Sequence, residues 1–200
     1  MNKNLVSWMS YDFANSFTDT ALGSLFLAQW IIIDKGFDEI WYGATFSLAT
    51  ILILLTAPFI GAWSDRLKKR LPFIKWLTVL LFISQGLLAF FIPINFPQRV
   101  LFVLFFLFII QYLYQISLIF YIFLLQKIST KTTSGKICGL GEMSGMIGWF
   151  VSLLILLPFS EGKISLFGEP GRAQVFIPAF IFFVIFSLPL LLLFKEKTTK

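Results

Sequence analysis

Residues 61–70 read Gly61-Ala62-Trp63-Ser64-Asp65-Arg66-Leu67-Lys68-Lys69-Arg70. The segment carries one acid followed by a cluster of basic residues, and it joins two apolar runs, Ile40–Trp63 and Phe73–Ile94. Each run has the length, about 20 residues, that a helix needs to cross the hydrocarbon core of a bilayer. The segment is therefore predicted to be a short polar turn between two membrane spans, and the same pattern continues along the chain on both sides.

The composition agrees with a lipid environment. Of the 200 residues, 58% are hydrophobic and 13% are charged, and 26 are Phe. A water-soluble domain of this size cannot hide so much apolar surface. In lipid every backbone polar group must be paired within the protein, which leaves helices or closed barrels. Because the apolar runs are continuous and do not alternate with a period of two, we predict an all-α, polytopic transmembrane helical bundle.

The apolar runs define six spans with short connections between them. The spans are predicted at Trp8–Ile33, Ile40–Trp63, Phe73–Ile94, Val100–Leu125, Ile137–Phe159 and Gln174–Phe194. One side of the membrane then holds Asp34–Glu39, Asn95–Arg99 and Ser160–Ala173. The other side holds both termini with Ser64–Pro72 and Gln126–Lys136.

The basic residues are divided unequally between these two sides. The first side has four, Lys35, Arg99, Lys163 and Arg172. The side of the termini has twelve, Lys3, Arg66, Lys68, Lys69, Arg70, Lys75, Lys127, Lys131, Lys136, Lys195, Lys197 and Lys200. Because Lys and Arg accumulate in cytoplasmic loops, we predict an integral, multi-pass protein of the cell membrane with both termini in the cytoplasm. This bias also accounts for the net charge of +6, so no nucleic-acid partner is predicted.

Histidine is absent, and Cys138 is the only cysteine. One chain therefore cannot form a disulfide or a His/Cys metal site, and acid–base catalysis by histidine is excluded. A membrane-embedded enzyme would depend on Asp and Glu with a metal, but Asp34, Asp38 and Glu39 form only a short loop that is expected to be solvated. We predict no enzymatic activity, no metal and no cofactor.

The first span carries a polar stripe. The stripe consists of Asp12, Asn15, Ser16, Asp19 and Gly23. These residues are spaced i, i+3, i+4, i+7 and i+11, which places them on one face of a helix. A carboxylate at the centre of a span costs about 2.5–3.5 kcal/mol, so Asp19 is expected to face protein or water. The stripe either lines a cavity or forms buried polar contacts that order the bundle. Because intramembrane acids are functional hypotheses by default, we favour the cavity.

The fourth span has a second polar patch near its middle, formed by Gln111, Tyr114 and Gln115. If the first and fourth helices are neighbours, this patch and Asp19 line one site near the midplane of the membrane. The alternative is that the glutamines only form hydrogen bonds between helices.

The fifth span begins with small residues and an acid. Gly141 and Gly145 form a small-xxx-small pair, which lets helices approach closely. Glu142 shares a face with Gly145 and is predicted to turn into the bundle, within about two turns of the cytoplasmic edge. Asp12 has a similar depth. These two acids are either cytoplasmic gate residues or hydrated acids at the membrane interface.

The third and sixth spans are nearly pure hydrocarbon, and such helices can face lipid on all sides. Polarity thus falls from the first span to the third and again from the fourth to the sixth. This repetition favours a three-plus-three arrangement, which is known from transporter halves. Residues 1–95 would form the first repeat, residues 96–194 the second, and residues 195–200 a cytoplasmic tail or the start of a central loop.

With these features the chain resembles the N-terminal half of a major facilitator superfamily transporter. The superfamily's signature between spans two and three reads roughly G-x-x-x-D-R/K-x-G-R/K-R. The residues that match it are Gly61, Asp65, Arg66, Lys69 and Arg70. Lys68 stands where a glycine is usual, which is a departure from the pattern.

Three further stretches are similar to the branch of the superfamily that is related to fungal vacuolar effluxers. They are Ser7-Trp8 with Tyr11-Asp12-Phe13-Ala14-Asn15-Ser16, then Ala57-Pro58 with Gly61, and Ser134-Gly135-Lys136-Ile137-Cys138-Gly139-Leu140-Gly141. The resemblance covers the whole chain. It implies alternating access around a site lined by helices one and four, with helices three and six peripheral. It also implies that Asp65 and Arg66 help to hold the cytoplasmic side closed.

The resemblance implies secondary active transport of a small solute, and its vacuolar branch suggests amino-acid export. Because the superfamily has two six-helix halves, the chain is expected to be a fragment or a split half that packs against a second bundle, either a separate chain or a second copy. Asp19 would carry a proton or contact a cationic or zwitterionic solute. The alternative is a structural or regulatory membrane subunit without a solute pathway, which the Gly141/Gly145 pair and the chain length favour.

Overall fold

The computed structural model describes residues 3–66 and 69–196, and these form helices and connecting turns without a strand. In chain order the elements are α1 (Lys3–Thr18), η1 (Asp19–Ser24), α2 (Phe26–Gln29), η2 (Trp30–Asp34), α3 (Glu39–Asp65), α4 (Leu71–Phe91), α5 (Arg99–Ile128), α6 (Ser134–Ser160), η3 (Gly171–Gln174) and α7 (Phe176–Leu193). The segments η1 and η2 are π-helical, and η3 is a 3-10 helix. Lys68 of the signature and the basic residues Lys197 and Lys200 lie outside the described residues.

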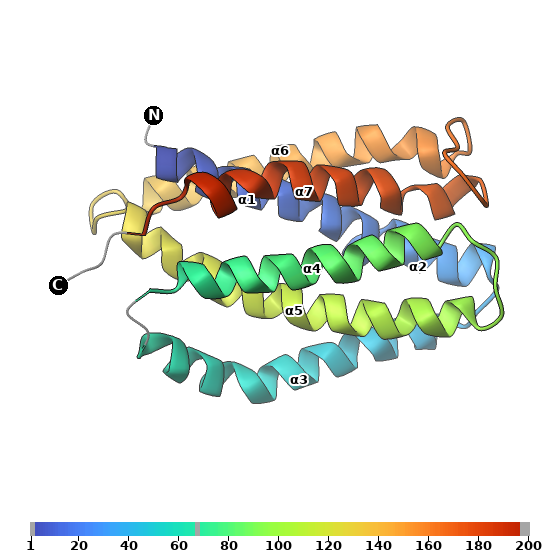
Figure 1. Cartoon of the computed structure of the whole chain (residues 1–200), viewed down its shortest axis with the longest axis horizontal. Coiled ribbons are helices and arrows are strands. Elements are labelled where there is room, and N and C mark those ends of the chain that lie inside the picture. The colour runs from blue at the N-terminus through green and yellow to red at the C-terminus, as the bar shows by residue number, and fades with distance from the viewer. Residues whose placement is uncertain (1–2, 67–68, 197–200) are drawn as a thin grey trace.

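In the part of the chain that the structure describes, six helical segments are long and apolar enough to cross a membrane. They are Lys3–Asp34 (α1 to η2), Glu39–Asp65, Leu71–Phe91, Arg99–Ile128, Ser134–Ser160 and Gly171–Leu193. The predicted all-helical fold is confirmed over the described residues, and the six candidate spans have the length and composition of an integral, multi-pass membrane protein. Figure 1 shows the helices side by side, with the start of α1 and the end of α7 at one end of the bundle. We call this the terminal end and the opposite one the distal end.

Helix ends follow the local sequence. The Asp38 carboxylate accepts a hydrogen bond from the Ile40 amide at 3.1 Å and caps the first turn of α3. Pro72 lies in the first turn of α4, where its missing N–H has no partner to lose. Between η2 and α3 the chain turns through Gly36, whose φ of 66° favours glycine.

Helix packing crosses between the two halves of the chain. α1 packs against α6 and α7, α5 packs against α3 and α4, and α4 contacts α7. α1 and α5 meet toward the terminal end, where the rings of Trp8 and Tyr121 stack with their centroids 4.7 Å apart. The Trp8 indole N–H donates to the Tyr121 carbonyl, and the Tyr121 hydroxyl donates to the Trp8 carbonyl, both at 3.2 Å. This reciprocal pair joins the first and fourth spans.

The third and sixth spans could have faced lipid on all sides, but the structure buries part of each, and they are not the most exposed spans. In their most apolar windows, α4 and the Gly171–Leu193 span each bury 39% of the residues, whereas α3 buries 6% and α6 buries 17%. α4 and α7 pack against each other, for example through the rings of Phe82 and Phe183, which meet edge to face at 5.5 Å. Hydropathy could not reveal the contact between α4 and α7, because an apolar side chain can pack equally well against lipid tails or a neighbouring helix.

An ion-pair network joins three connections at the distal end. Glu169 accepts hydrogen bonds from Lys35 Nζ at 2.6 Å and from Arg99 Nη1 at 2.7 Å. Both cations also lie over the ring of Trp30, at 5.3 Å and 5.1 Å from its centroid. Burial raises the pKa of the Glu169 carboxyl, but the hydrogen bonds from Lys35 and Arg99 outweigh it and hold the pKa below its ordinary value.

This network makes the stability of the fold depend on pH. Because the folded pKa of Glu169 is below the unfolded one, its stabilisation is present above the unfolded pKa and is lost as the pH falls through the folded pKa. We expect Glu169→Gln to lower the unfolding temperature at neutral pH and to flatten its decline on acidification. Thermal unfolding in detergent across this pH range is the measurement, with Glu161→Gln, an exposed acid, as the control. The same acid-induced decline in Glu169→Gln and wild type would contradict the assignment.

Candidate functional site

A cavity of about 250 Å³ lies between the first, fourth and fifth spans. Its lining residues are Asp12, Asn15, Ser16, Asp19, Tyr114, Glu142, Gly145, Met146 and Trp149. Asp19 and Tyr114 each lie within one residue of the midpoint of their spans, so the cavity reaches the middle of the bundle. Three of the described lining residues are carboxylates and none is basic. We therefore call it the acidic cavity.

The acidic cavity brings together residues that the sequence singled out on three separate spans. These are Asp12, Asn15, Ser16 and Asp19 of the first span, Tyr114 of the fourth, and Glu142 and Gly145 of the fifth. Gln111 and Gln115 are not among its lining residues; Gln111 is buried and Gln115 is half-buried. Sequence reasoning missed Met146 and Trp149, although they follow Glu142 at i+4 and i+7 and so share its face.

Asn15 is the least satisfied polar group of the cavity. The residue is 3% exposed, and neither the side-chain amide nitrogen nor the amide oxygen has a hydrogen-bond partner among the described residues. A buried polar group left unpaired costs about 1–3 kcal/mol, so a native structure keeps one only for a reason. A molecule that both donates and accepts hydrogen bonds would satisfy it.

The first span breaks at the depth of Asp19. Residues Asp19–Ser24 are π-helical, and Leu25 follows with φ −127° and ψ −69°, outside the helical region. Gly23 makes room for the acid, since a Cβ there would lie 2.6 Å from Asp19 Oδ1. π-helical turns inside longer helices are frequent at functional sites. The Gly-Ser pair at 23–24 was the available sequence signal, because such pairs are a known cause of kinks.

The hydroxyl of Tyr42 in α3 caps this break, lying 3.0 Å from the carbonyl oxygens of both Leu22 and Gly23. We expect Tyr42→Phe to lower the free energy of unfolding by about 1 kcal/mol and to speed hydrogen–deuterium exchange of residues 19–24. Tyr112→Phe is the matched control, because it also removes a hydroxyl bonded between α5 and α3 but does not touch the break. Equal acceleration in the two variants would show that Tyr42 has no specific role there.

α6 approaches α1 closely along a line of glycines, one of which, Gly145, lines the acidic cavity. A Cβ on Gly141 would clash with the Trp8 ring. A Cβ on Gly145 would lie 2.7 Å from Asp12 Oδ2, and a Cβ on Gly148 would lie 2.9 Å from the Phe13 carbonyl oxygen. The Ser16 hydroxyl donates to the Gly145 carbonyl at 2.7 Å. The predicted small-residue pair therefore lies at the contact between the first and fifth spans.

The charged turn between α3 and α4 is organised around Arg70. Its Nη2 pairs with Asp65 Oδ1 at 2.9 Å, and its Nε donates to the Ser64 carbonyl at 3.2 Å. The guanidinium lies 4.1 Å from the ring centroid of Phe123 in α5. Arg70 thus ties the ends of α3 and α4 to the fourth span within this chain.

The other signature residues point elsewhere. Arg66 is exposed and has no ion pair among the described residues. A Cβ on Gly61 would meet no atom within 4 Å, so this side of α3 is open. Lys69 lies in a separate pocket between α4 and the segment after α7. The signature residues are therefore not gathered into one contact.

The part of the chain that the structure describes contains no group of three His, Cys, Asp or Glu residues that could hold a metal ion. The loop acids have other partners: Asp34 pairs with Arg172, and Asp38 caps α3.

No protein-family model, characterised protein or solved structure matches this chain. The function is therefore inferred from the residues themselves.

Proposed function

We propose that this chain is one half of a secondary active transporter of the major facilitator type, which moves a small solute by alternating access. The acidic cavity carries the proposal, because three carboxylates and an unpaired amide gather there. One acid at the centre of a span costs about 2.5–3.5 kcal/mol. A group of acids with a broken helix beside it therefore favours a functional site over simple packing.

The order of helix contacts supports a three-plus-three arrangement. The first span contacts the fifth and sixth, and the fourth contacts the second and third. If span one is exchanged with span four, span two with span five and span three with span six, the contacts of the first span become the contacts of the fourth. The contact between the third and sixth spans is unchanged by this exchange. Two inverted three-helix repeats, residues 1–95 and 96–194, would produce this exchange.

The lining of the cavity favours a solute with a positive charge. The carboxylates of Asp12, Asp19 and Glu142 attract an ammonium group, and the rings of Tyr114 and Trp149 offer it aromatic faces. The nearby Asn15 amide can donate and accept hydrogen bonds. An amino acid has these groups, which agrees with the export function that the vacuolar resemblance suggests. Asp19 is also the candidate carrier of a coupling proton.

A second six-helix bundle, from another chain or a second copy, is proposed to cover α3 and α6. These are the least buried spans, and the rim of the acidic cavity on α6 is open, with Met146 73% and Trp149 42% exposed. Glu142 on the same rim is exposed and would meet hydrocarbon without a cover. We further propose that the terminal end, which carries most of the basic residues, faces the cytoplasm and that the bundle lies in the cell membrane.

Counterflow in vesicles tests this proposal. The chain, with any bundle that copurifies, is reconstituted into vesicles loaded with one unlabelled amino acid at a time, and uptake of the same labelled amino acid is followed at neutral and mildly acidic pH. We expect at least one amino acid, most readily a basic one, to accumulate above the level of protein-free vesicles. Uptake at the protein-free level for every amino acid would favour the structural or regulatory subunit instead.

A further inference from the structure

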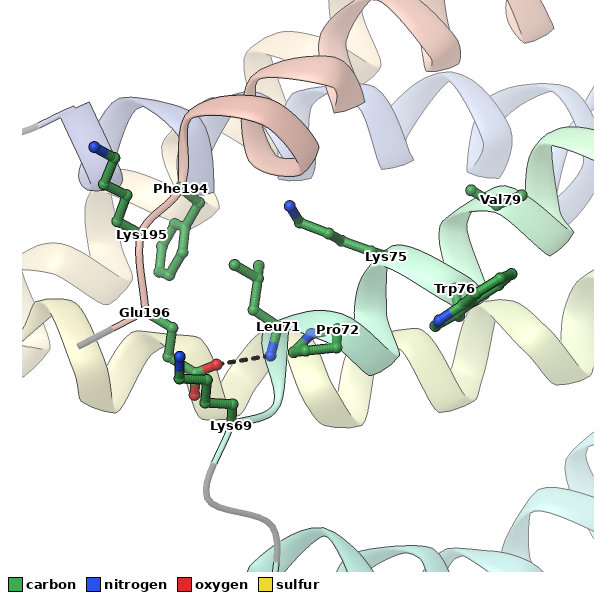
Figure 2. Close-up of a pocket in the computed structure, with 9 residues that line it drawn as sticks. All are labelled: Lys69, Leu71, Pro72, Lys75, Trp76, Val79, Phe194, Lys195 and Glu196. Atoms are coloured by element: carbon green, nitrogen blue, oxygen red, sulfur yellow. Dashed lines mark hydrogen bonds between the residues drawn. The ribbon is translucent and has the colours of Figure 1, made fainter. Parts of the chain in front are cut away.

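A second cavity, of about 600 Å³, opens at the terminal end between the start of α4 and the segment that follows α7. Figure 2 shows its lining residues, Lys69, Leu71, Pro72, Lys75, Trp76, Val79, Phe194, Lys195 and Glu196. We call it the lysine pocket. It shares no residue with the acidic cavity, and the transport proposal does not use it.

We propose that the lysine pocket binds one anionic phospholipid, with the phosphate between Lys75 and Lys195 and an acyl chain along Trp76 and Val79. Its volume is within the range of pockets that hold small ligands. Basic pockets between transmembrane helices on the cytoplasmic side are suited to anionic lipid headgroups.

The charge of the pocket favours an anion. The side-chain ammonium groups of Lys69, Lys75 and Lys195 have no carboxylate partner among the described residues. In Figure 2 the side chain of Lys75 extends from α4 toward the segment of Phe194 and Lys195. Lys75 comes from α4 and Lys195 from the segment after α7, so both walls of the pocket carry a lysine.

The one acid in the pocket is already engaged. Glu196 Oε2 accepts hydrogen bonds from the backbone N–H groups of Arg70 and Leu71, both at 2.9 Å, and so caps the start of α4. The helix dipole further offsets its negative charge. The same contact holds the segment after α7 against α4, so Glu196 forms a wall of the pocket.

The order of groups along the pocket matches a lipid more closely than a soluble anion. Lys69 precedes α4 and Lys195 follows α7, whereas Val79 is about 12 Å further along α4 than Leu71, at 1.5 Å per residue. Trp76 is 71% and Val79 39% exposed. Trp favours the interface between headgroups and hydrocarbon. A free phosphate would gain nothing from this apolar wall, whereas an acyl chain covers it.

Quenching of Trp76 fluorescence tests the proposal. The full chain is placed in phosphatidylcholine bilayers that contain either brominated phosphatidylglycerol or brominated phosphatidylcholine, and the Trp76 signal is the difference between wild type and Trp76→Phe. We expect stronger quenching by the anionic lipid. Lys75→Gln and Lys195→Gln should each weaken this preference about fivefold. Lys131→Gln, an exposed lysine of the α5–α6 connection, should retain it.

Two further arms separate lipid binding from other effects. The double variant Lys75→Arg with Lys195→Arg keeps both charges and should keep the preference. Inorganic phosphate in the buffer should not displace the brominated lipid. Equal quenching by the two lipids, an unchanged preference in both glutamine variants, or displacement by inorganic phosphate would each overturn the proposal.

Discussion

Replacing Asp19 by Asn is expected to reduce solute exchange by about ten- to a hundredfold, because it removes a charged partner worth roughly 1.5–3 kcal/mol. Asp19 lies at mid-span where the helix breaks, and it lines the acidic cavity with Tyr114. The amide keeps the size of the side chain but carries neither a negative charge nor a transferable proton. Counterflow of the responding amino acid, measured against pH, should also lose its pH dependence.

The same substitution should leave the fold intact. A neutral amide is less costly than a carboxylate in a low-dielectric site, so unfolding of Asp19→Asn in detergent should occur at or above the wild-type temperature. Glu39→Gln, which neutralises an exposed acid at the start of α3, is the control and should transport normally. Undiminished, pH-dependent exchange by Asp19→Asn would remove this residue from binding and coupling.

Gly148→Ala should destabilise the bundle by about 1–3 kcal/mol, the usual cost of overpacking a close contact. The new Cβ would lie 2.9 Å from the Phe13 carbonyl oxygen and 3.1 Å from the Phe13 Cα. These are backbone atoms, so α1 and α6 would have to separate. Because Ser16 of the acidic cavity lies at the same contact, transport should fall together with stability.

Gly139→Ala is the matched control for this prediction. It makes the same substitution in the same helix, but a Cβ at Gly139 meets nothing within 4 Å. Alanine is the better helix former by up to about 1 kcal/mol, so this variant should be as stable as wild type or more stable. Unfolding of both variants by denaturant in mixed micelles is the measurement. Equal stability of the two would show that α1 and α6 are not tightly packed at Gly148.

Much of the architecture could be predicted because lipid constrains the backbone so strongly. Apolar runs of sufficient length had to become helices, and the observed spans differ from the predicted ones by at most five residues at an edge. The polar stripe of the first span could also be placed, since Asp12 and Asp19 have few tolerable environments in a membrane. The predicted site residues Asn15, Tyr114 and Glu142 then gathered in one cavity.

Other features depend on contacts between distant segments that periodicity does not encode. The stripe was derived for a regular helix, and the π-helical turn at Asp19 depends on the space at Gly23 and on the Tyr42 hydroxyl. The partner of Asp65 is Arg70, although several basic residues nearby were equally plausible from charge alone. The ion pairs of Glu169 could not be predicted, because its partners, Lys35 and Arg99, come from two other connections.

Accessibility of position 19 in the intact membrane is the most direct test. Asp19→Cys is made in a Cys138→Ser background, so that the new thiol is the only one, and Ile185→Cys, an exposed apolar position of α7, serves as the lipid-facing control. Reaction of the thiol at 19 with a polar, membrane-impermeant reagent, with no reaction at 185, is the predicted result. If position 19 reacts only with a lipid-soluble reagent, as position 185 should, its side chain faces hydrocarbon and the transporter account is contradicted.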